Sequence, residues 1–240
     1  MSFIHDTALF SNSTMGDNCS IYAKCRVRNS SLGSFVSIGD ESSVLRSSLG
    51  DHLFIQRYND IIYSNIGRYT CTGRFDAIHC ATVGAFCSIS WDVSIGGDNH
   101  DPSLLSTHPF YYQSIFGMAQ DPKAQEQELL NDIENEPCKS GNDVWIAAGV
   151  KINRNLEIGD GAIIGANSTV TRSIPPYSIA VGSPARVIKM RFDKGIIEEL
   201  KQIKWWDFSD NVLKDNLDLF KSPVDADTIK KLWKLKELQK

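Results

Sequence analysis

An internal repeat of seventeen residues constrains the fold more than any other feature. An aliphatic residue or methionine followed by glycine recurs five times at this spacing: Met15-Gly16, Leu32-Gly33, Leu49-Gly50, Ile66-Gly67 and Val83-Gly84. Self-similarity at a fixed short period is typical of solenoid proteins, in which each repeat buries its apolar side chains only against its neighbours. The sequence therefore predicts a stack of similar coils.

Within each repeat, bulky side chains recur in steps of six, six and five residues, and a second run that starts near residue 140 keeps steps of six. A period of six fits neither an α-helix nor simple strand alternation over this length. It predicts a parallel β-helix with three flat sides. The bulky positions are Met15, Ile21, Val27, Leu32, Ile38, Val44, Leu49, Ile55, Ile61, Ile66, Thr72, Ile78, Val83, Ile89 and Ile95, then Ile146, Ile152, Ile158, Ile164 and Val170.

The same spacing suggests how the interior is filled. Small side chains often stand four residues after a bulky one, as at Cys19, Cys25, Ser31, Ser48 and Cys87. We expect the aliphatic residue to fill a corner of the triangle, and the residue four later to point inward along a flat side. Cysteines at these inward positions are expected to be small buried hydrophobes.

Two segments interrupt the repeat. Residues 101–142 lack the period and form an excursion that is aromatic in its first half and acidic in its second. Insertions of this length in a solenoid usually carry function. We predict a β-helix over residues 1–189 that contains this excursion, and a C-terminal helical extension over residues 190–240.

The extension is expected to hold two helices. Over Arg191–Phe208, apolar residues fall on one stripe that ends at Trp206. A second helix is predicted over Thr228–Leu238, with Asp225 or Asp227 near its start. A helical cap has a physical reason here, because an open solenoid end is a row of unpaired backbone groups.

Composition excludes several classes of protein. Lysine and arginine total 25 and aspartate and glutamate 29, so the formal net charge is −4, which argues against a nucleic-acid-binding surface. No apolar run approaches the roughly 20 residues that span a bilayer. The first ten residues show no signal peptide. The six cysteines form no CxxC pair, so reduced thiols and a cytoplasmic location are expected.

Three short motifs accompany the repeats: Asn99-His100 followed by STHPF at residues 106–110, GSPARVI at residues 182–188, and KWWDF at residues 204–208. Together with the repeats, they resemble the hexapeptide-repeat acyltransferases, most closely the xenobiotic acetyltransferase branch. That branch includes chloramphenicol and streptogramin acetyltransferases and many sugar O-acetyltransferases. The resemblance covers residues 15–100 and 140–206.

The resemblance implies an all-β-dominated fold, a left-handed parallel β-helix with an excursion loop and a C-terminal α-helical cap. It implies the left hand of the coil, which spacing alone cannot give. It also implies a homotrimer with the active site in the cleft between two subunits, acetyl-CoA lying along one wall, and a single histidine that activates the acceptor. No metal is expected.

His100 is the predicted general base. It stands seventeen residues after Val83, where the next bulky position is due and the coil departs into its excursion. A neutral imidazole can accept the proton of an acceptor hydroxyl as that oxygen attacks the thioester. Backbone amides of a neighbouring coil would stabilise the oxyanion. Direct transfer between two bound reactants needs no serine or cysteine nucleophile.

Other histidines offer alternatives. His79 should point outward toward a subunit cleft, and His108 precedes a proline, a context similar to that of the catalytic histidine in some sugar acetyltransferases. A zinc site of His79, His100 and His108, as in gamma-type carbonic anhydrases, is the metal alternative, but their spacing does not match. His5 and His52 are expected to be solvated surface residues.

The resemblance also assigns acetyl-CoA contacts residue by residue. Ala148 and Ala166 would offer backbone groups to the pantetheine arm. Ala147 stands where the usual motif has glycine, and its methyl group narrows the space for that arm.

The nucleotide end would meet cations. Thr171 and Arg172 sit where the family commonly has Thr-Lys, and Lys189 sits where a basic residue often meets the phosphates. Trp145 would pack on the adenine or at the trimer contact.

The excursion also contains four aromatic residues, Phe110, Tyr111, Tyr112 and Phe116. They are expected to form either a wall for the acceptor or a contact with the neighbouring subunit.

Taken together, the resemblance implies an acetyl-CoA-dependent acetyltransferase that acts on a sugar hydroxyl in surface-polysaccharide biosynthesis. An antibiotic hydroxyl and a sugar amine are the alternative acceptors. A non-catalytic β-helix scaffold is the alternative of another class, but it would leave His100 and the SPARVIKM segment unexplained.

Overall fold

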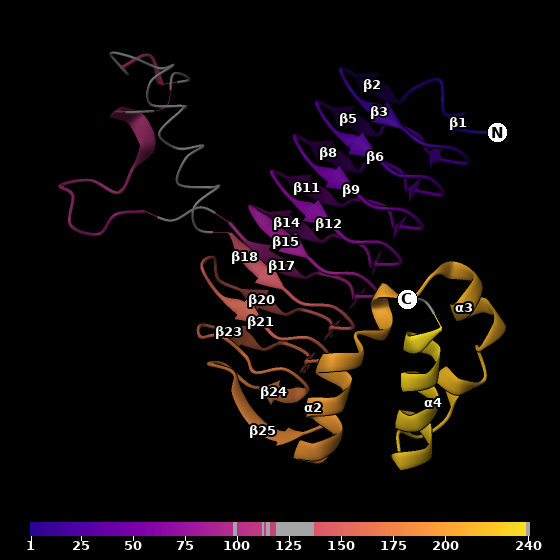
Figure 1. Cartoon of the computed structure of the whole chain (residues 1–240). Coiled ribbons are helices and arrows are strands. Elements are labelled where there is room, and N and C mark those ends of the chain that lie inside the picture. Colours follow the sequence, from indigo (N-terminus) through magenta and orange to yellow (C-terminus); the bar gives the residue numbers. More distant parts are fainter. Residues whose placement is uncertain (98–99, 112, 114–115, 119–136, 239–240) are drawn as a thin grey trace.

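The computed structural model describes residues 1–97, 100–111, 113, 116–118 and 137–238. Short strands wind into a solenoid with three sheets, here named A, B and C in the order in which the chain visits them (Figure 1). One complete coil is called a rung. The chain passes from sheet A through the A–B corner to sheet B, then through the B–C corner to sheet C, and returns through the C–A corner.

The strands follow this order throughout. Sheet A contains β1 (Phe3–Ile4), β4 (Ser20–Ile21), β7 (Ser37–Ile38), β10 (Phe54–Ile55), β13 (Cys71–Thr72), β16 (Ser88–Ile89), β19 (Trp145–Ile146), β22 (Ile163–Ile164), β24 (Ser178–Val181) and β25 (Arg186–Met190). Sheet B contains β2 (Leu9–Ser11), β5 (Arg26–Arg28), β8 (Ser43–Leu45), β11 (Asp60–Ile62), β14 (Ala77–His79), β17 (Ser94–Gly96), β20 (Lys151–Ile152) and β23 (Thr169–Val170). Sheet C contains β3 (Thr14–Met15), β6 (Ser31–Leu32), β9 (Ser48–Leu49), β12 (Asn65–Ile66), β15 (Ala81–Val83), β18 (Cys138–Ser140) and β21 (Glu157–Ile158).

The register confirms the predicted parallel β-helix and shows two rung lengths. Before the excursion, Phe54 pairs with Cys71, seventeen residues later. After it, Trp145 pairs with Ile163, eighteen residues later. Within the described strands, every pairing is parallel except that of β24 with β25, which closes sheet A as an antiparallel hairpin. The hand of the coil stays a prediction from the resemblance.

The expected division between corners and flat sides was wrong. The aliphatic residues lie in the strands, as Ile21 and Ile38 do, and both are fully buried. The small inward residues, such as Cys25 and Ser42, stand beside the turns instead. Two walls converge at a corner and leave room only for a small side chain, whereas the middle of a flat side faces the widest part of the interior.

The step from sheet B to sheet C is five residues long instead of six, so the inward-pointing residue follows the bulky residue by three positions instead of four. Ser30 and Ser47 are buried there, three residues after Val27 and Val44, whereas Ser31 and Ser48, expected to point inward, are exposed. The expectation for the cysteines is confirmed: Cys19, Cys25 and Cys87 are free thiols buried in the core.

An aromatic stack runs along the C–A corner. Rings of Phe35, His52, Tyr69 and Phe86 lie parallel on successive rungs, with centroid separations of 4.7, 4.5 and 4.8 Å. Trp205 of the C-terminal region continues the stack, 4.8 Å from Phe86. His52 is therefore a half-buried stacked ring, and the expectation that it would be solvated was wrong.

The C-terminal region contains three α-helices and two short 3-10 turns within the described chain: α2 (Lys194–Ile203), η3 (Trp205–Asp207), α3 (Asp210–Asp215), η4 (Leu219–Lys221) and α4 (Ala226–Glu237). The stripe predicted for the first helix is buried at Ile197, Leu200 and Ile203. Asp225 caps α4 by accepting a hydrogen bond from the Thr228 N–H at 2.8 Å. Helix α3 was not predicted, because it is only six residues long.

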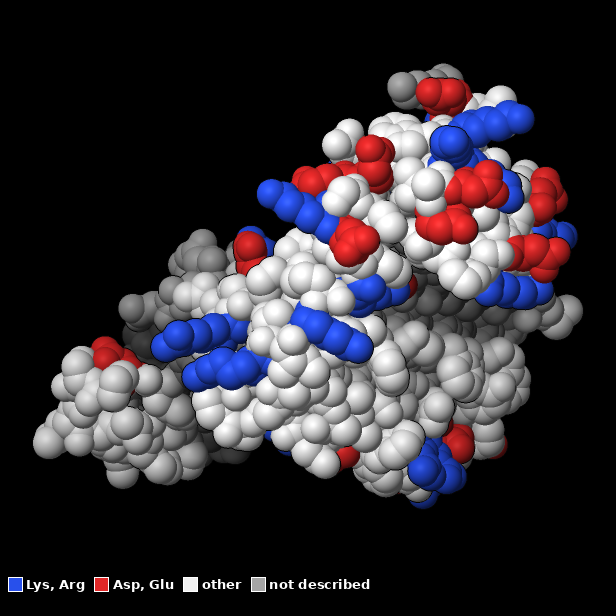
Figure 2. Space-filling model, turned by 90° about the horizontal axis from the view of Figure 1, so that it is seen from below, with Lys and Arg blue, Asp and Glu red and all other residues white. Residues whose placement is uncertain are grey.

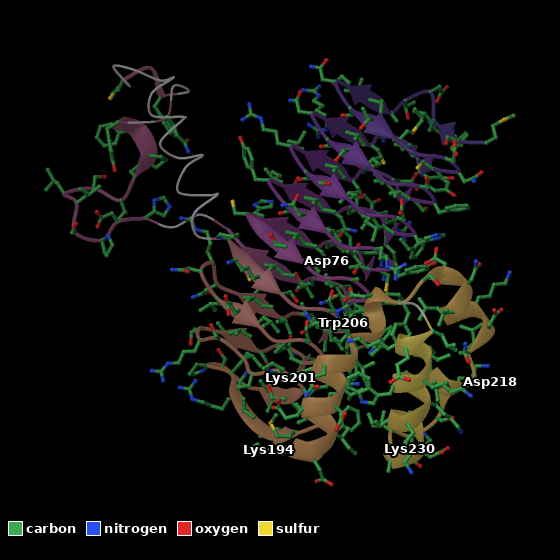
Figure 3. All side chains as sticks on the ribbon, viewed as in Figure 1. Asp76, Lys194, Lys201, Trp206, Asp218 and Lys230 are labelled. Atoms are coloured by element: carbon green, nitrogen blue, oxygen red, sulfur yellow. The ribbon has the colours of Figure 1, made fainter. Side chains whose placement is uncertain are left out.

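Ion pairs join these helices to the solenoid. Arg68 lies 2.6 Å from Asp210 and donates a hydrogen bond to the Trp206 carbonyl at 2.9 Å. Arg191 lies 3.0 Å from Asp143. Trp206 is buried where α2 ends, between the helices and the rungs (Figure 3), as core packing rather than as a ligand site. The helices therefore pack along the C–A side of the solenoid.

Candidate active site

The excursion leaves and rejoins the solenoid at the B–C corner. The Gly97 N–H donates to the His79 carbonyl at 3.2 Å, and the Cys138 N–H donates to the Cys80 carbonyl at 3.0 Å. Both ends of the excursion are thus held by consecutive residues of the preceding rung. Strand β18 begins at Cys138, inside the range 101–142 predicted for the excursion.

Glycine is required where the chain departs. Gly96 has φ +78°, and a Cβ atom there would lie 1.9 Å from the His79 carbonyl oxygen. Other residues would be strained at this φ and would push the departing chain away from the preceding rung. The close approach of Gly96 to the His79 carbonyl therefore determines where the chain leaves the solenoid, four residues before His100.

His100 follows three residues after Gly97, and its side chain is exposed. Within the described part of the chain it makes no hydrogen bond or ion pair. Its predicted companion Asn99 lies outside the described residues. His100 therefore lies on the excursion just after the chain leaves the B–C corner.

His79 forms a side-chain pair on the outer face of sheet B. Its Nε2 lies 3.1 Å from Oδ2 of Asp60, and its side chain is half-buried. The outward direction predicted for His79 is what the structure shows. A carboxylate that accepts from one ring nitrogen leaves the other free to accept a proton, so this pair has the geometry of an oriented base. Asp60 was not predicted from the sequence, although both residues face outward on adjacent strands.

His108 is held within the excursion. Its Nδ1 accepts a hydrogen bond from the Phe110 N–H at 3.1 Å, at the start of η1 (Pro109–Tyr111). Its ring lies 5.0 Å from that of Phe116, and Tyr111 lies 5.7 Å from Phe110. These rings form a small aromatic cluster. The backbone of the described excursion residues stands away from the rungs (Figure 1). Tyr112 lies outside the described residues.

The residues predicted for the pantetheine arm lie on the A–B corner. Ala148 and Ala166 occupy equivalent positions on adjacent rungs, and the Asn167 N–H donates to the Ala148 carbonyl at 2.9 Å. The N–H groups of Ala148 and Ala166 donate to no acceptor among the described residues. Two N–H donors on adjacent rungs are therefore left without an acceptor in the described part of the chain. Ala147 precedes the first of them and is half-buried.

The residues predicted for the nucleotide lie at the C-terminal end of the solenoid. Thr171 and Arg172 follow β23 and are exposed, as is Lys189 in β25. Arg186, also exposed in β25, belongs to the SPAR segment but was not selected from the sequence. Figure 2 views the molecule from below and shows one area with mainly Lys and Arg side chains and another where both charges are mixed.

The last rung holds this hairpin in place. The Ala185 N–H donates to the Thr169 carbonyl at 2.8 Å, and the Gly182 N–H donates to the Ser168 hydroxyl at 3.0 Å. Trp145 lies elsewhere, on the outer face of sheet A, and is 52% exposed. The structure thus places Trp145 on a flat side and the other predicted acetyl-CoA residues at the A–B corner or the C-terminal end.

Two further properties bear on the site. Within the described ranges, no three His, Cys, Asp or Glu side chains are arranged to hold a metal ion together. No helix in the same ranges has the length and apolar character needed to cross a membrane.

Comparison with known proteins gives consistent matches. A family model described as bacterial transferase hexapeptide (six repeats) matches residues 141–172. A probable macrolide acetyltransferase from Lysinibacillus sphaericus is 39% identical over 153 residues, which are 61% of this chain and 80% of the relative. A chloramphenicol acetyltransferase from Morganella morganii is 35% identical over 140 residues, 57% of this chain and 64% of the relative.

A shorter match is stronger in identity. The galactoside O-acetyltransferase of Escherichia coli strain K12 is 51% identical over 68 residues, 28% of this chain and 34% of the relative. Among solved structures, a serine acetyltransferase from Neisseria gonorrhoeae is 21% identical, with a TM-score of 0.40 over 57% of this chain and 43% of that one. A likeness this low adds nothing to the functional argument.

Proposed function

Since this chain belongs to the hexapeptide-repeat acyltransferases, in the xenobiotic acetyltransferase branch, it is an acetyltransferase, and we propose that it transfers the acetyl group of acetyl-CoA directly to a sugar hydroxyl. The observation that carries this proposal is the presence of unpartnered groups at two corners of the solenoid. Among the described residues, the imidazole of His100 has no partner, and the N–H groups of Ala148 and Ala166 have no acceptor.

His100 is proposed as the general base. Its ring has no partner among the described residues, so an acceptor hydroxyl can reach it. As the hydroxyl oxygen attacks the thioester carbonyl, the proton passes to the imidazole, the C–S bond breaks, and the proton returns to the thiolate of CoA. His79, oriented by Asp60, and His108 are the alternative bases. Phe110 and Tyr111 are proposed to line the acceptor site.

Acetyl-CoA is proposed to lie along the A–B corner of the rungs after the excursion. The free N–H groups of Ala148 and Ala166 match the carbonyl oxygens of a pantetheine arm. Thr171, Arg172 and Lys189 would hold the nucleotide phosphates at the end of the solenoid.

We propose a cytoplasmic homotrimer with its active site between two subunits, and a role in surface-polysaccharide biosynthesis. In the described part of a single chain, His100 projects from the B–C corner and the free N–H groups lie at the A–B corner, so sheet B separates them. A neighbouring subunit that brings its own A–B corner to this histidine would complete the site. Trp145, exposed on sheet A, is proposed to contact either the neighbour or the adenine.

An antibiotic hydroxyl is the second candidate acceptor. The observation in its favour is that the two longer alignments are to proteins named macrolide and chloramphenicol acetyltransferases. The shorter alignment, at higher identity, is to a galactoside O-acetyltransferase and favours a sugar.

The test has two steps. First, the melting temperature is measured against acetyl-CoA concentration, and a rise that grows with ligand is expected. Second, release of free thiol is followed with panels of sugars and of antibiotics. No melting shift at millimolar acetyl-CoA would count against the proposed function. Thiol release with antibiotics and with none of the sugars would replace the first acceptor by the second.

A further inference from the structure

A groove on the rungs before the excursion has no role in the site described above. It has a volume of about 650 Å³ and lies along sheet A and the A–B corner. Ser37, Gly39 and Gly73 leave its floor open because their side chains are small or absent. Its walls are formed by Tyr22, Asp40, Phe54, Arg57, Arg74 and Trp91.

The groove is continuous with the proposed acetyl-CoA wall. Arg57, Arg74 and Trp91 occupy the same corner position on three successive rungs, and Ala148 and Ala166 occupy it on the next two. The Gly149 N–H donates to the Trp91 carbonyl at 3.0 Å, so Trp91 lies directly beside Ala148. A pantetheine arm that starts at the C-terminal cations and follows Ala166 and Ala148 therefore leads to Trp91 and into this groove.

Backbone donors along the groove are open. In an earlier rung, the Ala23 N–H is capped by Oδ1 of Asp40 at 2.9 Å. Further along, the next residue in the column is an arginine, a tryptophan or an alanine, none of which can accept. The N–H groups of Arg57, Arg74 and Trp91 consequently have no acceptor among the described residues.

The C–A corner provides the contrast. There the N–H groups of Asp17, Ser34 and Ala85 are capped by side chains of the next rung, which are Ser34, Asp51 and Asn142. At that corner the N–H groups of Asp51 and Arg68 have no acceptor among the described residues, so three of five are capped, whereas beside the groove three consecutive N–H groups are open. Open donors in a row favour an anionic or carbonyl-bearing ligand.

The side chains give the ligand its chemistry. Arg57 and Arg74 are exposed and form no ion pair within the described chain. Adjacent rungs are separated by about 4.8 Å, so two guanidinium groups can contact one phosphate, which arginine binds in bidentate fashion. Trp91 is 59% exposed and Phe54 is 53% exposed. Exposed aromatic faces of this kind stack on sugar rings.

We propose that this groove binds the acceptor, and that the acceptor is a phosphorylated sugar whose phosphate is held by Arg57 and Arg74 and whose ring packs on Trp91. The inference rests on the proposed acetyl transfer and deepens it, because it names the substrate class. The carboxylate of Asp40 is already engaged by the Ala23 N–H. The groove therefore carries two cationic side chains and one anionic side chain, of which Oδ1 is already hydrogen-bonded.

Binding is tested directly on the full chain by isothermal titration calorimetry with a panel of hexose 1-phosphates and the matching free hexoses. At least one hexose 1-phosphate is expected to bind, more tightly than its free hexose and than inorganic phosphate. Arg57→Ala and Arg74→Ala should each weaken that binding about tenfold or more, since each removes a charge-assisted contact. Trp91→Ala should weaken it toward the affinity of inorganic phosphate.

The matched control is Arg28→Ala, which removes an exposed arginine from β5 on sheet B. It should leave hexose phosphate binding unchanged. The three arginine variants should keep wild-type affinity for acetyl-CoA, measured separately, so that a failure of acetyl-CoA binding counts against the proposed function alone. The inference is overturned if acetyl-CoA binds and no hexose phosphate does, or if Arg57→Ala and Arg74→Ala behave like Arg28→Ala.

Discussion

The rungs before the excursion and the rungs after it turn their corners with different residues. Each corner needs a residue with positive φ. At the A–B corner before the excursion, the large side chains of Tyr58 and Phe75 take this conformation, with φ 65° and 63°. After the excursion, the corresponding positions are held by Gly149 and Asn167. Glycine and asparagine enter the left-handed region readily, whereas other residues pay about 1–2 kcal/mol each.

Stacking explains why the first half tolerates this cost. The rings at the C–A corner lie on one another from Phe35 to Phe86, and such pairs contribute about 0.5–1.5 kcal/mol each beyond burial. At the A–B corner the rings of Tyr58 and Phe75 stack at 5.0 Å before the excursion, whereas the equivalent residues after it, Gly149 and Asn167, carry no ring beside Ala148 and Ala166. The difference shows that the same fold carries stacked aromatic rings along its corners in the first region and small residues at the A–B corner in the second, where acetyl-CoA is proposed to bind.

The two halves also differ at the B–C corner. Before the excursion the corner is one residue shorter and is closed by a serine ladder, in which each backbone N–H donates to the serine hydroxyl of the previous rung. The ladder runs through Ser13, Ser30, Ser47 and Ser64 and ends at Ala81. After the excursion the segment from sheet B to sheet C is one residue longer, so that each rung has eighteen residues. The excursion thus begins where the ladder ends.

The largest expected effect is on the rate of acetyl transfer, and it comes from a substitution at the junction between the two halves. His100→Ala is expected to lower the rate of acetyl transfer by about 10²–10⁴-fold, because it removes the proposed base, while the melting temperature and acetyl-CoA affinity stay at wild-type values. The rate is measured as thiol release under saturating acetyl-CoA. His79→Ala and His108→Ala are the matched controls and should change the rate far less.

A wild-type rate in His100→Ala would move the role of base to another residue. A large loss in His79→Ala that Asp60→Asn reproduces would assign it to the pair on sheet B, whose side chains lie 3.1 Å apart.

The next largest effect is expected within the first half, at Asp76 (Figure 3). Its carboxyl group is 1% exposed; Oδ1 accepts from the Val93 N–H at 2.8 Å, and Oδ2 has no partner among the described residues. Burial, and secondarily the nearby charge of Asp92, raises the pKa of Asp76 from 3.8 to about 7. In the folded protein the carboxyl therefore favours its protonated form.

The pH dependence follows from that direction. The contribution of Asp76 to stability is fully present below pH 3.8 and is lost as the pH rises to about 7. Asn59, one rung earlier, uses its amide to donate to the Gly73 carbonyl at 2.8 Å. Asp76→Asn should supply the same donor without a charge and so stabilise the protein at pH 8 by a few kcal/mol. Urea unfolding between pH 4 and pH 8 checks this, and a gain that does not shrink toward pH 4 would contradict it.

The sequence was informative about the fold because burial repeats with the rung. The period of seventeen predicted a stack of coils and the finer period of six predicted the parallel β-helix, and the cysteines were placed correctly inside it. Spacing alone could not locate the corners, so the aliphatic residues were assigned to them, and Ser31 was chosen where Ser30 points inward. The stack that contains His52 could have been found, since Phe35, His52 and Tyr69 recur at the same period.

The candidate site was less accessible to sequence reasoning. His100 could be selected from a motif, but its reaction partner is expected on another subunit, which no local pattern describes. The pairing of Asp60 with His79 spans nineteen residues, two more than a rung, and so falls outside the repeat. The groove of Arg57, Arg74 and Trp91 became visible only when the corner column was laid out in space.

The serine ladder should give a smaller effect that is confined to the short rungs. The Ser47 hydroxyl accepts from the Ser64 N–H at 3.1 Å and donates to the Leu45 carbonyl at 2.7 Å. Ser47→Ala leaves a buried N–H without an acceptor and should destabilise the protein by about 1–3 kcal/mol in urea unfolding. The control Ser48→Ala removes an exposed hydroxyl and should cost less than about 0.5 kcal/mol. Equal losses in the two variants would show that the ladder contributes nothing particular to the short rungs.

The smallest effect should separate stacking from backbone strain at His52, which has φ 58° and lies between the rings of Phe35 and Tyr69. His52→Ala removes both stacking contacts and keeps the strain. His52→Gly removes the same contacts but relieves the strain, at the cost of a more flexible unfolded chain. Both should be less stable than wild type, and the glycine variant should be the more stable of the two by about 0.5–1 kcal/mol. If alanine is tolerated better than glycine in urea unfolding, the corners of the first half are not strained, and the contrast with Gly149 and Asn167 loses its energetic basis.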